Sequence, residues 1–197
     1  MNLGQSVQLK DAVRADLDPD APLVVIVDQQ THLTHALQYK NETLLDVFTI
    51  PNATGKASTP TPNCRAKIVQ KELNPSWKPP VSIDPKQKVI PPYIETHCNP
   101  LGLANLRLNV DHGMIALHGT NEPKRIGQSV SHGCIRHLNK DIVTLYKMVR
   151  LGTPVYIVAR TDDAIIPLDE FQTLSTVARQ ELNSAIGAIH ARDLSAI

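Results

Sequence analysis

The sequence lacks the features by which membrane-spanning and nucleic-acid-binding proteins are identified. No stretch approaches the roughly 18 consecutive apolar residues of a membrane span. Lys and Arg number 20 against 19 Asp and Glu, and they form no long basic run, so no electrostatic signature for nucleic acid is present. The first ten residues also lack the charged-then-apolar pattern of a secretory signal. We therefore expect no membrane span and no nucleic-acid partner, in a chain that either stays inside the cell or is preceded by a leader outside this sequence.

Cysteine is scarce, and its number is odd. The three cysteines are Cys64, Cys98 and Cys134, and disulfides use thiols in twos, so at least one of them is unpaired. Whether Cys64 and Cys98 pair with each other is left open by the sequence. An unpaired thiol needs its own explanation.

The composition supports a globular fold. With 197 residues, 42% of them hydrophobic and 20% charged, the chain suits one domain, or one domain with an appendage. Residues 1–20 are polar and predict a flexible N-terminal arm. We expect the main domain over residues 21–160 and a helical extension over residues 161–197.

Short apolar segments separated by turn residues predict a mainly β fold with few helices. Strands are expected over residues 22–28, 32–40, 44–50, 66–70, 105–110, 114–119 and 154–160, the first two as a hairpin. In the second strand, alternation predicts that Leu33, His35, Leu37 and Tyr39 share one face. The proline-rich residues 74–93 cannot supply an interior strand and predict a long surface loop.

Two helices are predicted near the C-terminal end. The first begins with Asn139 as its N-cap and ends before Gly152, with apolar residues recurring at helical spacing from Ile142. The second follows Pro167, where an apolar stripe runs over residues 171–189.

Reactive side chains are densest in HGTNEPKRIGQSVSHGCIR, residues 118–136. His118 ends a predicted strand, and His132 and Cys134 lie in a predicted turn. An adjacent imidazole can lower the pKa of a thiol from about 8.5 to roughly 3.5–7.5 and so supply a thiolate nucleophile. Gly133 permits a tight turn in which neighbouring amides point to one spot beside the sulfur, as acyl transfer requires.

Two other interpretations fit the same residues. A lone buried cysteine is usually a small apolar side chain, and a lone histidine is usually a hydrogen-bonded structural residue. A metal site of His112, His118, His132 and Cys134 is chemically conceivable, but no CxxC, HExxH or similar close spacing supports it. We therefore predict no metal and no other cofactor.

The segment resembles the L,D-transpeptidase catalytic domain family, often called YkuD-like, whose signature is His-Gly followed by Ser/Thr-His-Gly-Cys and Ile/Val-Arg. The likeness extends to the sequences GKASTPTP, NPSW, VIPP, NPLGLANLRL and LGTPVYIV, covering residues 22–160. Cys64 departs from the pattern, because family members usually carry glycine there. The resemblance implies a β-sandwich or barrel with a C-terminal helix added.

The resemblance also implies roles for single residues. Cys134 corresponds to the nucleophile, His118 to its base, and the Gly119 carbonyl to the group that orients the imidazole. The amides of His132, Gly133 and Cys134 correspond to the oxyanion hole. Ser131, the His132 side chain and Arg136 would shape or bind the substrate, Arg136 as a carboxylate partner or as part of a structural salt bridge. Trp77 and Tyr93 would line the groove or simply anchor the proline-rich loop.

The implied reaction is acyl transfer from a peptidoglycan stem tetrapeptide. A thioester would form at the diaminopimelate carboxyl with release of D-Ala, and an amine of another stem, an envelope lipoprotein lysine or water would resolve it. This implies a periplasmic or cell-envelope location and covalent inhibition by carbapenems. Two alternatives stay open: a catalytically silent peptidoglycan-binding module, and a thiol hydrolase acting on another amide.

Overall fold

A computed structural model of the chain describes residues 6–8, 12–81, 84–94, 99–111, 114–160, 165–167 and 170–171. Its strands are β1 (Ser6–Gln8), β2 (Val13–Arg14), β3 (Val24–Asp28), β4 (Leu33–Lys40), β5 (Thr43–Gly55), β6 (Cys64–Leu73), β7 (Ala104–Leu108), β8 (Ala116–His118), β9 (Ser129–Ser131), β10 (Ile135–His137), β11 (Pro154–Val158) and β12 (Ile165–Pro167). The helical elements are the 3-10 turn η2 (Pro123–Arg125) and the α-helix α1 (Asn139–Met148). The predicted mainly β class is confirmed.

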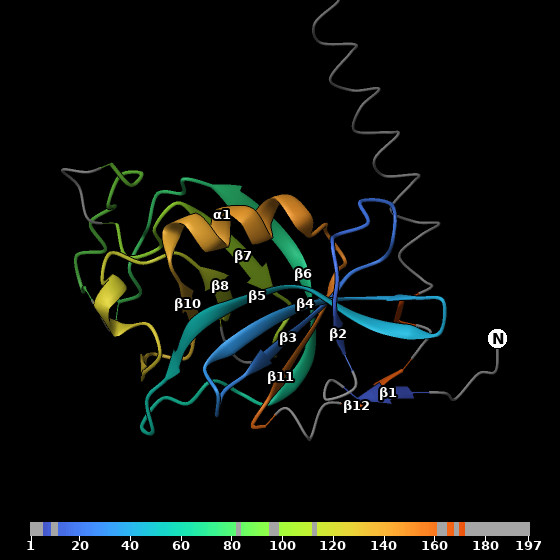
Figure 1. The fold of residues 1–197 in the computed structure, drawn as a ribbon. Coiled ribbons are helices and arrows are strands. Elements are labelled where there is room, and N and C mark those ends of the chain that lie inside the picture. The colour runs from blue at the N-terminus through green and yellow to red at the C-terminus, as the bar shows by residue number, and fades with distance from the viewer. Residues whose placement is uncertain are drawn as a thin grey trace, which may run out of the picture.

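The main sheet closes on itself. Its strands follow the order β10-β8-β7-β6-β11-β3-β4-β5, and β10 also pairs with β5, which joins the two ends into a barrel (Figure 1). Both β2 and β9 attach to β5. Closure leaves none of the barrel strands as an open edge, and it brings β10, far from β5 in sequence, next to β5, with β8 on the other side of β10.

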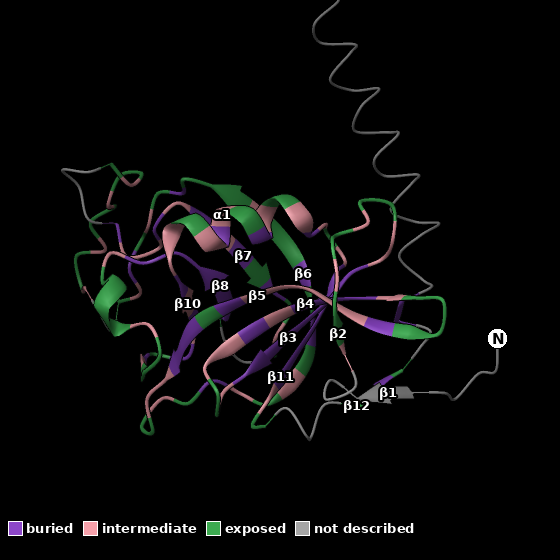
Figure 2. Ribbon diagram, viewed as in Figure 1, coloured by how far each residue is buried: buried purple, intermediate pink, exposed green. Residues whose placement is uncertain are grey.

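In the barrel, β3 lies between β11 and β4. All five of its residues are buried, as expected for a strand with a parallel neighbour, β11, and an antiparallel one, β4 (Figure 2). The pairing of β3 with β4 confirms the predicted hairpin.

The alternation predicted for β4 is confirmed. The register of β4 with β3 is unbroken from Leu33 to Leu37, so alternate side chains share a face, and Leu37 and Tyr39 pack in one apolar cluster. The register against β5 shifts beside Leu37, where Val47 of β5 is the extra residue.

Helix α1 packs against β7 and β8 through its buried residues Ile142 and Leu145, as the spacing predicts. The predicted cap is wrong, because Leu138 is the N-cap and Asn139 is the first helical residue. The Asn139 side chain instead binds the backbone of two neighbouring loops, as described below.

The proline-rich segment is a loop, as predicted, within the residues described there. Backbone hydrogen bonds between Trp77 and Ile90, of 2.9 and 2.8 Å, join its two limbs. The buried Asn99 amide donates to the carbonyls of Pro75, at 2.7 Å, and Pro91, at 3.0 Å. The loop is thereby fastened at its base beside β7.

Part of residues 1–20, the segment predicted as a flexible arm, lies in strands. In this segment, β2 pairs with β5, and β1 pairs with β12. The domain boundaries stay predictions. The second predicted helix lies outside the described residues from residue 172 onward, but Phe171 is buried and its ring lies 5.8 Å from that of Tyr39.

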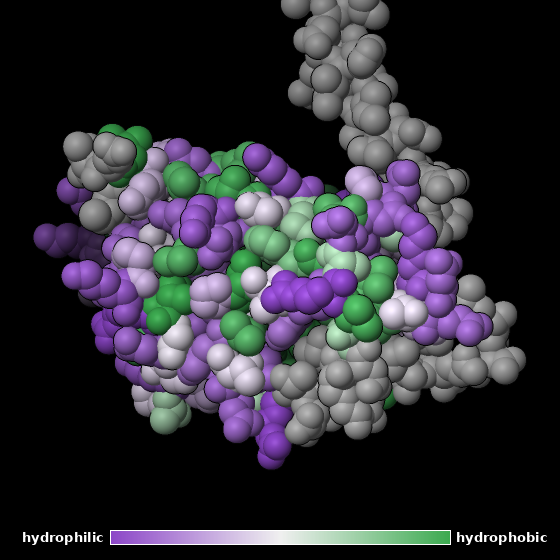
Figure 3. All heavy atoms as spheres, in the orientation of Figure 1, coloured by the Kyte–Doolittle hydropathy of each residue, from purple (hydrophilic) through white to green (hydrophobic). Residues whose placement is uncertain are grey.

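Among the described residues, no helix has the length and apolar character needed to cross a membrane. On the face seen in Figure 3, hydrophilic side chains are widespread and hydrophobic ones form small groups between them.

Candidate active site

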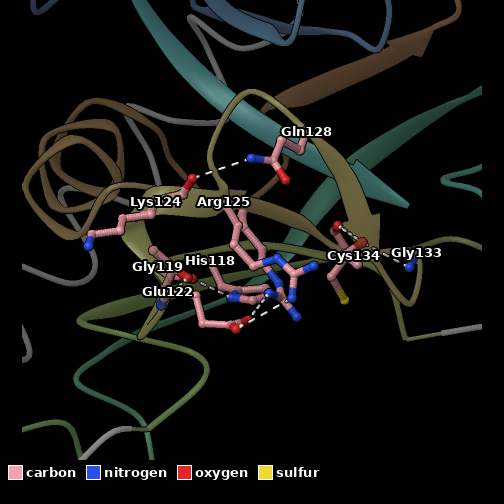
Figure 4. Close-up of polar contacts among 11 residues, drawn as sticks. His118, Gly119, Glu122, Lys124, Arg125, Gln128, Gly133 and Cys134 are labelled. Atoms are coloured by element: carbon pink, nitrogen blue, oxygen red, sulfur yellow. Dashed lines mark hydrogen bonds and ion pairs between the residues drawn. The ribbon is translucent and has the colours of Figure 1, made fainter. Parts of the chain in front are cut away.

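The sequence-predicted base is the last residue of β8, and the predicted nucleophile directly precedes β10. In the parallel pair of β8 and β10, Arg136 is in register with His118. Cys134 lies two residues before Arg136. The side chains of Cys134 and His118 line the same pocket, and Figure 4 shows them together.

A backbone hydrogen bond orients the imidazole of His118. Its Nδ1 donates to the Gly119 carbonyl at 2.7 Å, which leaves Nε2 as the unprotonated nitrogen. Burial lowers the pKa of His118 to about 4, an effect that backbone hydrogen bonds with Gly119 and Pro100 oppose and the Arg136 charge reinforces. The ring is therefore neutral at physiological pH and can accept a proton at Nε2.

The Gly119 carbonyl is in turn fixed by tight packing. A Cβ on Gly119 would lie 2.2 Å from Asn139 Oδ1 and 3.0 Å from the Gly102 Cα, so no larger residue fits. Asn139 Oδ1 accepts from the amides of Thr120, at 3.1 Å, and Leu103, at 3.2 Å, and its Nδ2 donates to the Thr120 carbonyl. The first residue of α1 thus locks the backbone that orients His118.

The turn before Cys134 is closed by Ser131. Gly133 has a positive φ of 115°, a conformation that favours glycine. The Gly133 amide donates to Ser131 Oγ at 3.0 Å, and Ser131 Oγ donates to the Cys134 carbonyl at 2.6 Å. Of the three amides expected in the oxyanion hole, that of Gly133 is thus engaged within the protein.

Two threonines of the GKASTPTP segment, in the loop between β5 and β6, anchor this turn. Thr61 Oγ1 accepts from the Gly55 amide and donates to the Gly133 carbonyl, both at 2.8 Å. Thr59 Oγ1 donates to the Ser131 carbonyl at 3.1 Å. Neither hydroxyl was assigned a role from the sequence, because the partner of each lies 72 residues away in the chain.

The thiol is protonated in this arrangement. Cys134 Sγ donates to the Met114 carbonyl at 3.3 Å. Burial raises the pKa of Cys134, and a hydrogen bond from the Ala116 backbone and the Arg136 charge only partly oppose this. The net pKa of the Cys134 thiol is therefore raised by burial, whereas the sequence led us to expect a pKa lowered by an adjacent imidazole.

Arg136 already has an anionic partner. Its guanidinium donates to Glu122 Oε2 at 2.9 Å, and Arg125 lies 3.6 Å from the other oxygen of the same carboxylate (Figure 4). Of the two roles that the sequence left open, the salt bridge is the one present. The charge of Arg136 nevertheless reaches the site, because it acts on the pKa values of both Cys134 and His118.

The pocket around these residues has a volume of about 760 Å³. Of the side chains predicted from sequence, it brings together those of Trp77, His118, Ser131, His132, Cys134 and Arg136. Tyr93 is not part of its lining. Among the described residues, no group of three or more His, Cys, Asp or Glu side chains is arranged to hold a metal ion.

Two lining residues on β7 were missed. Asn105 and Arg107 both line the pocket, in register with His118 and Ala116 of β8. The alternation in residues 104–108, with buried Leu106 between them, already places the two polar side chains on the face opposite the core.

A β-barrel that carries a cysteine and a neutral, oriented histidine at one pocket has the parts of a thiol-nucleophile site. The family model described as the L,D-transpeptidase catalytic domain, YkuD, matches residues 22–157. The chain belongs to this family.

Named relatives agree with this assignment. "Probable L,D-transpeptidase YcfS" of Escherichia coli K12 is 33% identical over 148 residues, which cover 71% of this chain and 45% of that protein. "Probable L,D-transpeptidase YbiS" of the same strain is 34% identical over 118 residues, covering 55% of this chain and 37% of that protein. The chain thus spans less than half the length of these curated relatives.

A solved structure shares the fold. L,D-transpeptidase 3 from Mycobacterium tuberculosis, in complex with a faropenem-derived adduct, superposes with a TM-score of 0.53 at 18% identity, covering 70% of this chain and 60% of that one. The barrel of this chain is therefore an L,D-transpeptidase fold.

Proposed function

We propose that the protein is a cysteine-dependent L,D-transpeptidase acting on peptidoglycan stem tetrapeptides. The observation that carries this proposal is the placement of Cys134, directly before β10, and His118, at the end of β8, in one pocket, with His118 Nδ1 bonded to Gly119 and Nε2 left to accept a proton. Family membership supports the choice of substrate. That substrate implies a periplasmic or cell-envelope location.

In the first half-reaction, His118 Nε2 takes the proton from Cys134 Sγ as the sulfur attacks the diaminopimelate carbonyl carbon. The amides of His132 and Cys134 donate to the oxygen that becomes negatively charged; one such donor contributes roughly 10²–10³ in rate. The carbon–nitrogen bond to D-Ala then breaks. The imidazolium returns its proton to the departing amine, and a thioester is left on Cys134.

The lowered pKa of His118 suits the second of these proton transfers. An imidazolium with a pKa of about 4 is a strong acid and gives up its proton readily to an amine that leaves. In the second half-reaction an acceptor amine attacks the thioester, loses a proton to His118, and displaces the Cys134 thiolate, which regains that proton. The acceptor is an amine of another stem or a lysine of an envelope lipoprotein, or water where the stem is trimmed.

The test is incubation with purified stem tetrapeptide, following D-Ala release and product masses. The wild type releases D-Ala and yields a cross-linked or trimmed product, while Cys134→Ala releases none. Cys64→Ala, which removes a half-buried free thiol outside the pocket, retains activity. Peptide binding without D-Ala release by the wild type would instead identify a silent binding module, and turnover only of other amides would identify a different thiol hydrolase.

A carbapenem should acylate the same sulfur, because its strained ring presents an activated carbonyl to the thiol. The mycobacterial L,D-transpeptidase 3 that shares this fold is in complex with an adduct derived from faropenem, another β-lactam, which supports this. Intact-protein mass spectrometry should show one adduct on the wild type and none on Cys134→Ala. An adduct of equal yield on the variant would place the reactive group elsewhere.

A further inference from the structure

The strand β7 borders the reactive pair and carries two polar groups that the proposed mechanism does not use. Asn105 is in register with His118, and Arg107 is in register with Ala116, in the antiparallel pair of β7 and β8. Both side chains line the pocket that holds Cys134. Since adjacent strands lie about 4.8 Å apart, Arg107 stands about 10 Å from Cys134, across β8.

Each of the two side chains has a polar group that can still bind a ligand. Asn105 Oδ1 is a buried acceptor with no hydrogen-bond partner among the described residues, a situation that folded proteins rarely tolerate without a ligand or water. Arg107 has no carboxylate within ion-pair distance in the part of the chain that the structure describes. A hydrogen-bond acceptor on Asn105 and a cation on Arg107, two residues apart on β7, are thus available to a ligand.

The other arginine of the pocket is engaged. Arg136 is paired with Glu122 at 2.9 Å, so an incoming carboxylate would have to displace an existing salt bridge there. At Arg107 it would displace only water. Of the two arginines in the pocket, Arg107 is therefore the one open to a carboxylate, on the β7 side and well away from the carbonyl that reacts at Cys134.

We propose that Arg107 and Asn105 form a recognition edge for the acyl donor, with Arg107 binding the side-chain carboxylate of diaminopimelate and Asn105 Oδ1 accepting a peptide N–H. This rests on the function proposed above and specifies its substrate. Diaminopimelate carries a second carboxylate at the far end of its side chain, whereas lysine at the same stem position has none. The edge therefore selects diaminopimelate stems over lysine stems.

The experiment measures binding and turnover separately. Two tetrapeptides, identical except for diaminopimelate or lysine at position three, are titrated into Cys134→Ala and into the Cys134→Ala, Arg107→Gln double variant by calorimetry. A charge-assisted hydrogen bond lost at this site weakens binding of the diaminopimelate peptide roughly 10- to 100-fold and leaves the lysine peptide unchanged. Arg125→Gln, which removes a nearby cation outside the pocket lining, should change neither affinity.

Asn105→Leu should weaken both peptides alike, because a peptide N–H is common to them. Equal affinity for the two peptides before the Arg107 substitution, an equal loss for both after it, or no binding of either would overturn the proposal. D-Ala release by proteins with Cys134 intact is scored independently. Selective binding without release would refute the transpeptidase activity and leave the recognition edge standing, whereas release without selectivity would do the reverse.

Discussion

The two sides of the pocket differ in how their polar groups are satisfied. On the side of residues 116–136, His118 Nδ1 bonds to Gly119, the Gly133 amide bonds to Ser131, and Arg136 pairs with Glu122. On the β7 side, Asn105 Oδ1 is buried without a partner among the described residues, and Arg107 has no ion pair there. On the first side the groups that orient the reactive pair are bonded within the protein, whereas on β7 two groups are left without a protein partner among the described residues.

This difference separates two tasks. Groups that must keep one geometry throughout a reaction benefit from being held by the protein itself, because preorganised donors need no rearrangement when charge develops. Groups that select a substrate must instead exchange water for the ligand. The contrast predicts that substitutions on the side of residues 116–136 change the rate of the chemical step, whereas substitutions on β7 change affinity.

The largest effect is expected at the base. His118→Gln removes the nitrogen that accepts the thiol proton, and kcat should fall by about 10²–10⁴ with little change in substrate affinity. D-Ala release under saturating tetrapeptide measures this. His132→Gln is the matched control, because His132 is an exposed residue of the same pocket. A greater loss for His132→Gln than for His118→Gln would reverse the assignment of the base.

A smaller effect is expected from the residue that locks the Gly119 backbone. Asn139→Ala leaves the Leu103 and Thr120 amides and the Thr120 carbonyl without their partner. Each of these groups that finds no water to bind lowers the free energy of unfolding by about 1–3 kcal/mol. Urea unfolding should show a lower free energy of unfolding, and kcat should fall as the His118 ring loosens. Lys140→Ala, at the exposed neighbouring position, should change neither. Unaltered stability and turnover in Asn139→Ala would mean that this network does not orient the base.

The contacts of the Asn139 side chain could not be predicted from the sequence. Its position before an apolar helical stripe is typical of an N-cap, but the contacts that occupy its side chain come from loops 19 and 36 residues away. The same limit explains why Thr61 was assigned no role, because the Gly133 carbonyl that it binds lies 72 residues away in the chain. Local patterns predicted the strands, helix α1 and the reactive pair, because alternation and motif spacing are short-range signals.

Burial is the other quantity that the sequence could not supply. The proximity of His118 predicted a thiolate at Cys134, yet the enclosed site raises the pKa of the thiol. Neighbouring residues in a motif reveal charge partners, but the cost of removing a charge from water depends on the surrounding fold.

The smallest expected effect is the change in the alkylation rate of Cys134 with pH, which tests whether burial raises the pKa of the thiol. Because the pKa of Cys134 lies above the ordinary 9.0, the thiolate fraction should keep rising as pH increases through 9. Alkylation of Cys134 by iodoacetamide, followed by peptide mapping from pH 5 to pH 10, should rise throughout this range. His118→Gln should leave the profile in place. A plateau below pH 8 that is lost in His118→Gln would instead show a thiolate–imidazolium pair in the free protein.

The measurement closest to the central claim is capture of the thioester. The protein is mixed with diaminopimelate tetrapeptide, quenched in acid within one turnover, and analysed by intact-protein and peptide mass spectrometry. We predict a mass increase equal to the tripeptide acyl group, located on Cys134, in step with stoichiometric release of D-Ala and absent from Cys134→Ala. Release of D-Ala by Cys134→Ala at the wild-type rate, or an acyl group carried by any other residue, would contradict the account.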